Sequence, residues 1–244
     1  MVKVVSFDVW NTLLRLDKVY VRLAELVGTV SSMSKEEALD KILKAYKEAK
    51  KLRRLGKVKA SEVVEKSRSL MAEYLGLKED VLINLITKSF LLLKTSEVLI
   101  EDVPTILKHI KKLGLRTVIL GNVLFWPSTY TRKLLESVGI SKYFDAQFYA
   151  DEVGVQKPDS KAFLIICKVL SVEPEEVIHV GDGISEDLGG ALSVGFKAVL
   201  ISDRVEKPIS IGDSIHIIPH IRHLILSLIH ISEPTRPLYI SYAV

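Results

Sequence analysis

The hydrophobic pattern begins with a short apolar run near the amino terminus. From Val2 to Phe7 the chain is rich in β-branched and aromatic residues, and only Lys3 is charged. A strand that is buried on both faces has this composition. The run stops at Asp8, and Asn11 and Thr12 then supply residues that are typical of a turn. We therefore predict a buried strand with a carboxylate at its carboxyl end.

The segment from 16 to 99 has a helical pattern instead. Ser34 and Glu37 have capping-box spacing, which predicts the start of a long helix. The apolar positions that follow it, at alternating steps of four and three, are Ala38, Ile42, Ala45, Ala49 and Leu52. Two further helices are predicted at 60–74 and 78–94. Between Lys35 and Lys59 there are ten Lys and Arg residues against four acids. This charge indicates either a solvated helix face or a field that attracts an anionic substrate.

From Glu101 onward, helical and strand-like segments alternate. Helices are predicted at 102–112, 128–138, 161–171 and 185–194. Strands are predicted at 115–120, 146–150, 177–180, 196–201 and 215–218. Strict alternation of this kind is typical of an α/β fold, a Rossmann-like parallel sheet with helices on both faces and right-handed crossovers.

These patterns predict two domains and a tail. Residues 1–15 and 100–229 form the α/β core, and 16–99 form an all-helical domain inserted into it. Residues 230–244 contain two prolines and no helical period, so we interpret them as a foreign or disordered tail.

Composition narrows the class of protein. Charged residues make up 26% of the chain, and the net charge of +4 is too small to indicate nucleic-acid binding. The single cysteine, Cys167, excludes an internal disulfide. No signal peptide is recognised, and no apolar run reaches the roughly 18 residues of a membrane span. We expect a cytoplasmic protein that binds neither nucleic acid nor membrane; the sequence does not indicate its oligomeric state.

Polar residues are found in four segments that lie at the ends of predicted strands or in the loops after them. They occur in the segments Asp8-Val9-Trp10-Asn11-Thr12, Gly121-Asn122, Lys157-Pro158, and Gly181-Asp182 through Asp187. The carboxyl ends of parallel strands are where open α/β sheets place their active sites. In order and context these segments resemble the four motifs of the haloacid dehalogenase superfamily, which consists mainly of phosphohydrolases. The resemblance covers nearly the whole chain except the tail, and it implies that the inserted helices form a cap between the first and second motifs.

The resemblance also implies a role for each residue. Asp8 would be the nucleophile that forms an aspartyl-phosphate, and Lys157 would bridge Asp8 and the phosphate. Mg²⁺ would be held by the Asp8 carboxylate, the backbone carbonyl of Trp10, Asp182 and Asp187, with Glu186 as a competing carboxylate for the last position. The substrate-binding residues implied are Trp10, Thr12, Gly121, Asn122 and Lys157. For Thr12, fixing the loop is the favoured role.

Two residues depart from the family pattern. Trp10 stands where phosphatases of the family carry the second Asp, a general acid, and an indole cannot shuttle protons. Gly121 stands where a hydroxyl helps to bind phosphate. We therefore predict a Mg²⁺-dependent phosphatase that acts on a small phosphorylated substrate. A metal-free 2-haloacid dehalogenase with Asp8 as nucleophile is the first alternative, since that branch has an aromatic residue at the position of Trp10. A non-catalytic phospho-ligand-binding protein is the second.

Overall fold

The computed structural model describes residues 1–232, and it confirms the predicted α/β fold. A seven-stranded sheet has the order β3-β2-β1-β4-β5-β7-β6. Its strands are β1 (Val4–Phe7), β2 (Arg116–Gly121), β3 (Ala146–Tyr149), β4 (Val177–Gly181), β5 (Lys197–Ile201), β6 (Ile209–Ile211) and β7 (Ile215–Ile218). Every neighbouring pair is parallel except β6 with β7. Because β1 lies between β2 and β4 and is parallel to both, the loops that follow these three strands begin side by side at the carboxyl edge of the sheet.

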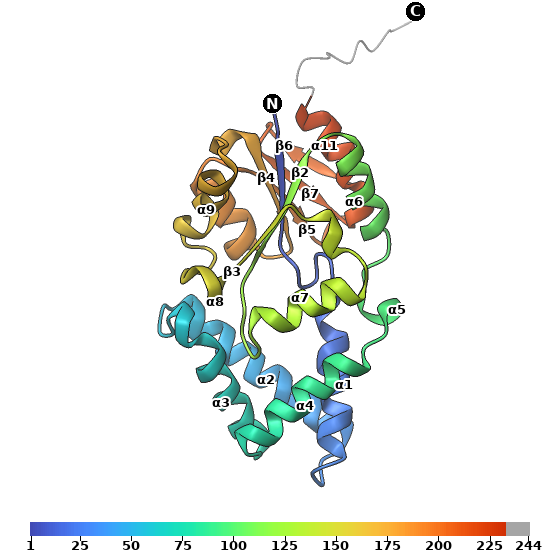
Figure 1. Cartoon of the computed structure of the whole chain (residues 1–244), viewed down its shortest axis with the longest axis vertical. Helices are drawn as coiled ribbons and strands as arrows, with labels where there is room; N and C mark the ends of the chain where they lie inside the picture. Colours follow the sequence, from blue (N-terminus) through green and yellow to red (C-terminus); the bar gives the residue numbers. More distant parts are fainter. Residues whose placement is uncertain (233–244) are drawn as a thin grey trace, which may run out of the picture.

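Helices cover both faces of the sheet (Figure 1). The helices of the α/β part are α6 (Val103–Lys112), α7 (Ser128–Ser137), α8 (Ala150–Val153), α9 (Ser160–Leu170), α10 (Gly190–Ser193) and α11 (Leu224–Ser232). Buried residues of α6, α7 and α11 belong to one hydrophobic cluster, and those of α9 and α10 belong to another. Along β1, Val5 and Phe7 pack into the first cluster and Val4 into the second. The alternation of a strand thus explains why the amino-terminal run is apolar throughout.

Five further helices lie between β1 and β2. They are α1 (Leu16–Gly28), α2 (Lys35–Arg54), α3 (Val63–Leu75), α4 (Glu79–Leu92) and the short α5 (Thr95–Val98). The predicted cap of α2 is confirmed, since the Ser34 side chain accepts a hydrogen bond from the backbone N–H of Glu37 at 3.1 Å. Figure 1 shows α1 to α4 together at one end of the molecule, away from the amino terminus.

The two connections to these helices run side by side. The backbone N–H of Arg15 donates to Val98 O at 2.8 Å, and that of Ile100 donates to Leu13 O at 3.1 Å. This short antiparallel pairing brings the entry and the exit of the inserted segment together. The division into domains at 15/16 and 99/100 remains a prediction, and these contacts are consistent with it.

The structure differs from the predicted elements in several places, including the following three. The antiparallel edge strand β6 was not predicted, although Ile209-Ser210-Ile211 alternates and Gly212 follows it at φ 57° as a turn residue. The helix predicted at 185–194 is a π-helical turn, Ile184–Gly189, followed by α10. The last helix, α11, runs to Ser232 and so includes 230–232 of the predicted tail, whose remaining residues lie outside the described part.

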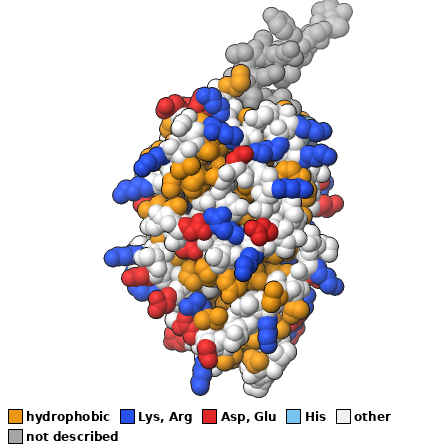
Figure 2. Space-filling model, viewed as in Figure 1, with side chains coloured by type: hydrophobic (Ala, Val, Ile, Leu, Met, Phe, Trp, Pro, Cys, Tyr) orange, Lys and Arg blue, Asp and Glu red, His pale blue; other side chains and the backbone are white. Residues whose placement is uncertain are grey.

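The surface is mixed in charge. Figure 2 shows acidic and basic side chains across the middle of the face that carries α7 and α8, with hydrophobic patches on either side. One ion pair on these two helices joins Arg132 to Glu152 at 2.6 Å. Within residues 1–232, no helix combines the length and apolar character that a membrane span requires.

Candidate active site

The polar residues at the strand ends come together in space. Asp8 follows β1, Asp182 follows β4, and Asp187 lies in the π-helical turn after it. Carboxylate oxygens of these three residues all lie within 4.8 Å of one another. A cluster of this kind is compact enough for one cation to contact all three carboxylates.

Lys157 joins two of the three acids. Its Nζ donates to Asp8 Oδ1 at 2.8 Å and to Asp187 Oδ1 at 2.6 Å, and its side chain is only 2% exposed. Burial by itself lowers the pKa of Lys157, but Asp187 and Asp8 outweigh burial and raise that pKa above its ordinary value. The ammonium group therefore keeps its charge at neutral pH.

For Asp8, burial outweighs the effect of Lys157 on the pKa. Burial raises the pKa of Asp8 to about 7; Lys157 opposes this shift, whereas the facing carboxylates of Asp187 and Asp182 add to it. Three acids thus face one lysine, and the nucleophilic form of Asp8 lacks a second compensating positive charge. A divalent cation in the cluster would supply that charge, so the donor set fits a magnesium ion.

Asp187 is held by more than Lys157. Its Oδ1 is 3.0 Å from His179 Nε2, and its Oδ2 accepts from the backbone N–H of Gly183 at 2.8 Å. Burial would raise the pKa of Asp187, but Lys157 and His179 outweigh burial and hold it well below its ordinary value. His179 in turn lies 2.9 Å from Ser6 Oγ. A buried chain of contacts therefore fixes Asp187 from the interior of the sheet.

Glu186, the competing carboxylate, also lines the cavity beside Asp8 but is bound by arginines of α2. It accepts hydrogen bonds from Arg54 Nε at 2.7 Å and Arg54 Nη2 at 2.9 Å, and Arg53 Nη2 lies 3.3 Å from its Oε1. Both arginines belong to α2, so this link joins the inserted helices to the turn that carries Asp187. Asp187 rather than Glu186 therefore belongs to the acidic cluster.

Asn122 forms a pair of hydrogen bonds with the main chain of Lys157. Its Oδ1 accepts from Lys157 N at 2.9 Å, and its Nδ2 donates to Lys157 O at 3.0 Å. The side chain thus holds the loop that presents Lys157, a contact that the sequence did not reveal. Its role in substrate binding remains a prediction.

The other two predicted substrate-binding residues lie outside the cavity beside Asp8. Thr12 is fully buried, and its hydroxyl has no hydrogen-bond partner within the described residues. A Cβ on Gly121 would lie 2.8 Å from two ring carbons of Tyr149, its partner residue on β3. The ring of Tyr149 therefore occupies the space that a side chain at position 121 would need.

A cavity of about 80 Å³ opens next to Asp8. One side consists of the loops that carry Asp8, Asn122, Lys157, Asp182 and Asp187, and the other of helices α1 and α2. Apolar and aromatic side chains form much of its wall, and two cations from α2 also line it. These residues are Trp10, Leu16, Tyr20, Tyr46, Leu124, Trp126, Lys50 and Arg53.

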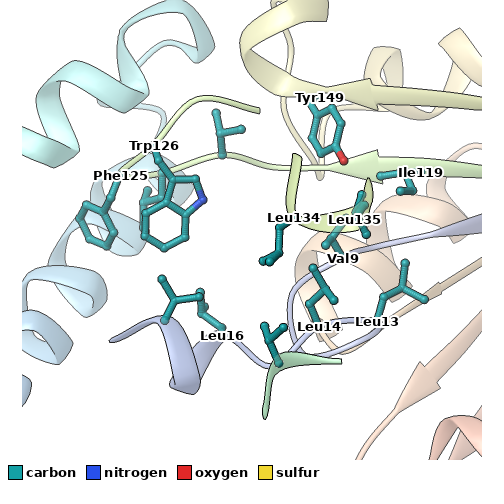
Figure 3. Packing of buried hydrophobic residues seen from close by; sticks show 14 of the residues in the cluster. Val9, Leu13, Leu14, Leu16, Ile119, Phe125, Trp126, Leu134, Leu135 and Tyr149 are labelled. Atoms are coloured by element: carbon teal, nitrogen blue, oxygen red, sulfur yellow. The ribbon is translucent and has the colours of Figure 1, made fainter. Parts of the chain in front are cut away.

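Aromatic rings join the two sides of this cavity. The ring centroid of Trp126 lies 5.7 Å from that of Trp10, 6.0 Å from that of Tyr20 and 5.0 Å from that of Phe90. Figure 3 shows Phe125 and Trp126 on the side of the inserted helices, whereas Tyr149 lies near the strand that carries Ile119. The partly buried Trp10 thus packs between the core and the insertion while it lines the cavity.

Several of these residues were not predicted. Tyr20, Tyr46, Lys50, Arg53 and Trp126 reach the cavity from segments that carry no motif. Lys50 and Arg53 belong to the basic segment between Lys35 and Lys59, for which attraction of an anionic substrate was one of two interpretations. Trp126 belongs to a buried apolar run that directly follows Asn122. His179 was hidden because it occupies an interior position of β4, where the pattern indicates only a buried side chain.

Comparison with known proteins agrees with this arrangement. The model of the haloacid dehalogenase-like hydrolase family matches residues 2–195. The chain therefore belongs to the haloacid dehalogenase-like hydrolase family.

The similarity to curated proteins covers only part of each chain. A glyceraldehyde 3-phosphate phosphatase from Methanopyrus kandleri is 32% identical over 100 residues, which are 41% of this chain and 42% of that protein. The chain thus aligns with less than half the length of the curated relatives it matches.

Among solved structures, the magnesium-bound putative HAD-hydrolase YfnB from Bacillus subtilis has a TM-score of 0.72 at 17% identity, covering 93% of this chain and 98% of its own. The L-2-haloacid dehalogenase from Xanthobacter autotrophicus has a TM-score of 0.64 at 20% identity, covering 84% of this chain and 80% of its own. At these identities the two structures show the shared fold.

Proposed function

We propose that this protein is a Mg²⁺-dependent phosphatase that hydrolyses a small phosphorylated substrate through an aspartyl-phosphate on Asp8. The observation that carries the proposal is the cluster of Asp8, Asp182 and Asp187 around Lys157, with carboxylate oxygens within 4.8 Å of one another. The similarity to a glyceraldehyde 3-phosphate phosphatase supports phosphoryl chemistry.

Magnesium fits the donor set because its preferred ligands are oxygens. Asp8, Asp182 and Asp187 would hold it together with the backbone carbonyl of Trp10. When bound, the ion neutralises charge on the carboxylates and on the phosphoryl oxygens.

The chain's own residues account for the transfer. An oxygen of Asp8 forms a bond to phosphorus, and the bond from phosphorus to the leaving oxygen breaks. Lys157, fixed by Asp187 and by the main-chain contacts of Asn122, holds its charge against the transferring group. Water then attacks phosphorus, which releases phosphate and restores the Asp8 carboxylate. Because Trp10 cannot donate a proton from an acid group, the leaving oxygen departs as an anion or takes its proton from water.

The inserted helices, 16–99, act in this proposal as a cap that excludes water and shapes the leaving-group side of the cavity. Their contribution of Tyr20, Tyr46, Lys50 and Arg53 to the cavity wall supports that role. The link from Arg54 to Glu186 supplies a polar contact between the cap and the core.

The two alternatives make different use of the same residues. The aromatic wall around Trp10 favours a haloacid dehalogenase, which needs Asp8 ionised without a metal. Burial, with Asp182 and Asp187 nearby, raises the pKa of Asp8 to about 7 and disfavours that state. A phospho-ligand-binding protein would keep Lys157 and the metal site without turnover.

A paired assay distinguishes these functions. Pure protein is incubated with an aryl phosphate with and without Mg²⁺, and with L-2-chloropropionate in EDTA. We expect phosphate release that requires Mg²⁺ and that is lost in Asp8→Asn. Chloride release in EDTA without phosphate release would establish the dehalogenase instead. Phosphate binding by calorimetry without any turnover would establish the binding protein.

A further inference from the structure

The cavity is lined by one cation, Lys50, that lies close enough to Glu186 and Asp182 to act on their charges but forms no ion pair with either. Lys157 is paired with Asp8 and Asp187, and Arg53 is paired with Glu186. Lys50, on α2, lines the same cavity, and among the described residues no carboxylate forms an ion pair with it. Its ammonium group lies 5.7 Å from the ring centroid of Tyr46. Lys50 is therefore a charged donor that is available to a ligand in the cavity.

The position of Lys50 determines which part of a ligand it can meet. Asp8 and Lys157 belong to the core side of the cavity, whereas Lys50 belongs to the inserted helix α2. In the proposed function the phosphoryl group lies against Asp8, so the leaving group extends toward the inserted helices. In that placement Lys50 reaches the cavity from the side toward which the leaving group extends.

The space between these two ends is bounded partly by aromatic side chains. Trp10, Tyr20 and Trp126 line it. At about 30 Å³ for each water, a cavity of about 80 Å³ corresponds to two or three water molecules. The cavity therefore has room only for a small ligand with a short body.

We propose that Lys50 is a specificity residue that binds a second negative charge on the substrate. The substrate class is then a small monophosphate whose leaving group ends in a carboxylate or another anion, with a short apolar body against the aromatic wall. This inference rests on the proposed function for the placement of the phosphoryl group, but it concerns binding and does not require turnover.

The test compares two ligands that differ only at the far end. Isothermal titration calorimetry in Mg²⁺ measures the Kd of propylphosphonate and of 2-carboxyethylphosphonate, in which a carboxylate replaces the terminal methyl group. Wild-type protein should bind the carboxylated ligand about 10- to 100-fold more tightly, the range of one charge-assisted hydrogen bond. Lys50→Met should reduce this preference to below about threefold, and Lys50→Arg should keep most of it.

Lys47→Met is the matched control, because Lys47 is exposed on the same helix and does not line this cavity. It should leave both affinities unchanged. If Lys50→Met weakens both ligands equally, Lys50 binds the phosphoryl group itself and the inference is wrong. If it changes neither Kd, or if neither ligand binds the wild-type protein, the inference is also overturned. An intact preference in a protein that releases no phosphate would refute the phosphatase function alone.

Discussion

Replacement of Gly121 by alanine tests whether the Tyr149 ring is the reason for the glycine. The added Cβ would lie 2.8 Å from Cδ1 and from Cε1 of Tyr149, whereas carbon atoms in contact are about 3.5–4.0 Å apart. The ring must therefore move by roughly 0.7 Å or more.

Tyr149 has little freedom to move. Its side chain is 1% exposed, its hydroxyl donates to Gln147 Oε1 at 3.0 Å, and the Arg132 guanidinium lies 4.9 Å from the ring centroid. Overpacking of a well-filled core costs about 1–3 kcal/mol. Alanine has less conformational entropy than glycine in the unfolded chain, and this difference offsets the cost by about 0.4–1 kcal/mol.

We expect Gly121→Ala to lower the free energy of unfolding by about 1–2 kcal/mol. For a chain of this length the Tm should fall by roughly 2–8 °C in a thermal scan. Gly189→Ala is the control, since its Cβ would meet only Ile184 O, at 3.4 Å, on backbone with φ −63°. Its Tm should be unchanged or slightly higher.

A double-mutant cycle identifies the cause of the loss. In a Tyr149→Leu background the ring is absent, so Gly121→Ala should cost less than in the wild type. Equal costs in both backgrounds, or an unchanged Tm for the single variant, would refute the steric explanation.

Two further predictions concern the contacts between the core and the inserted helices. Trp10→Asp should raise kcat/KM for alkyl phosphates by up to about 10² more than for aryl phosphates, because a general acid helps poor leaving groups most; a flat plot of log(kcat/KM) against leaving-group pKa for the wild type would contradict this account. Glu186→Gln should lower stability by about 1–3 kcal/mol at neutral pH, since it breaks a pair that is buried at Glu186 and half-exposed at Arg54. Glu62→Gln, which breaks an exposed pair, is the control and should leave the Tm nearly unchanged. Burial raises the pKa of Glu186, but Arg54 and nearby cations outweigh burial and hold that pKa below its ordinary value of 4.5. The stability from this ion pair is therefore present above pH 4.5 and is lost as the pH falls through the lowered pKa. A Tm difference between wild type and Glu186→Gln that does not narrow at acid pH would exclude the ion pair as its source.

The sequence was sufficient to predict most of the α/β architecture. Strand and helix periods are local signals, and parallel strands bring their carboxyl ends to one edge. Those two facts place Asp8, Asp182 and Asp187 at the same edge of the sheet, and the resemblance to the haloacid dehalogenase superfamily implied that they form one site. The order of the motifs then indicated Lys157 as the fourth member.

The remaining part of the site depends on contacts with no local pattern. Arg54 and Glu186 are 132 positions apart, and nothing in the sequence around either residue indicates the other. Lys50 belongs to a helix with many cations, so its position in the cavity appears only after α2 is packed. The start of α1 also lacked a signal, because Arg15 provides no side-chain cap.

The two departures from the family pattern are both accommodated by aromatic packing. Trp10 contacts Trp126 and Phe90, with ring centroids 5.7 and 6.3 Å away, so an aspartate in its place would leave a gap between the core and the inserted helices. A serine in place of Gly121 would collide with Tyr149. An aspartate at position 10 would therefore remove volume and a serine at position 121 would add volume, although the neighbouring side chains fit Trp10 and Gly121. The charged residues around Asp8 do not depend on either substitution, and on this basis we propose a phosphatase that lacks a general acid and is selective for good leaving groups.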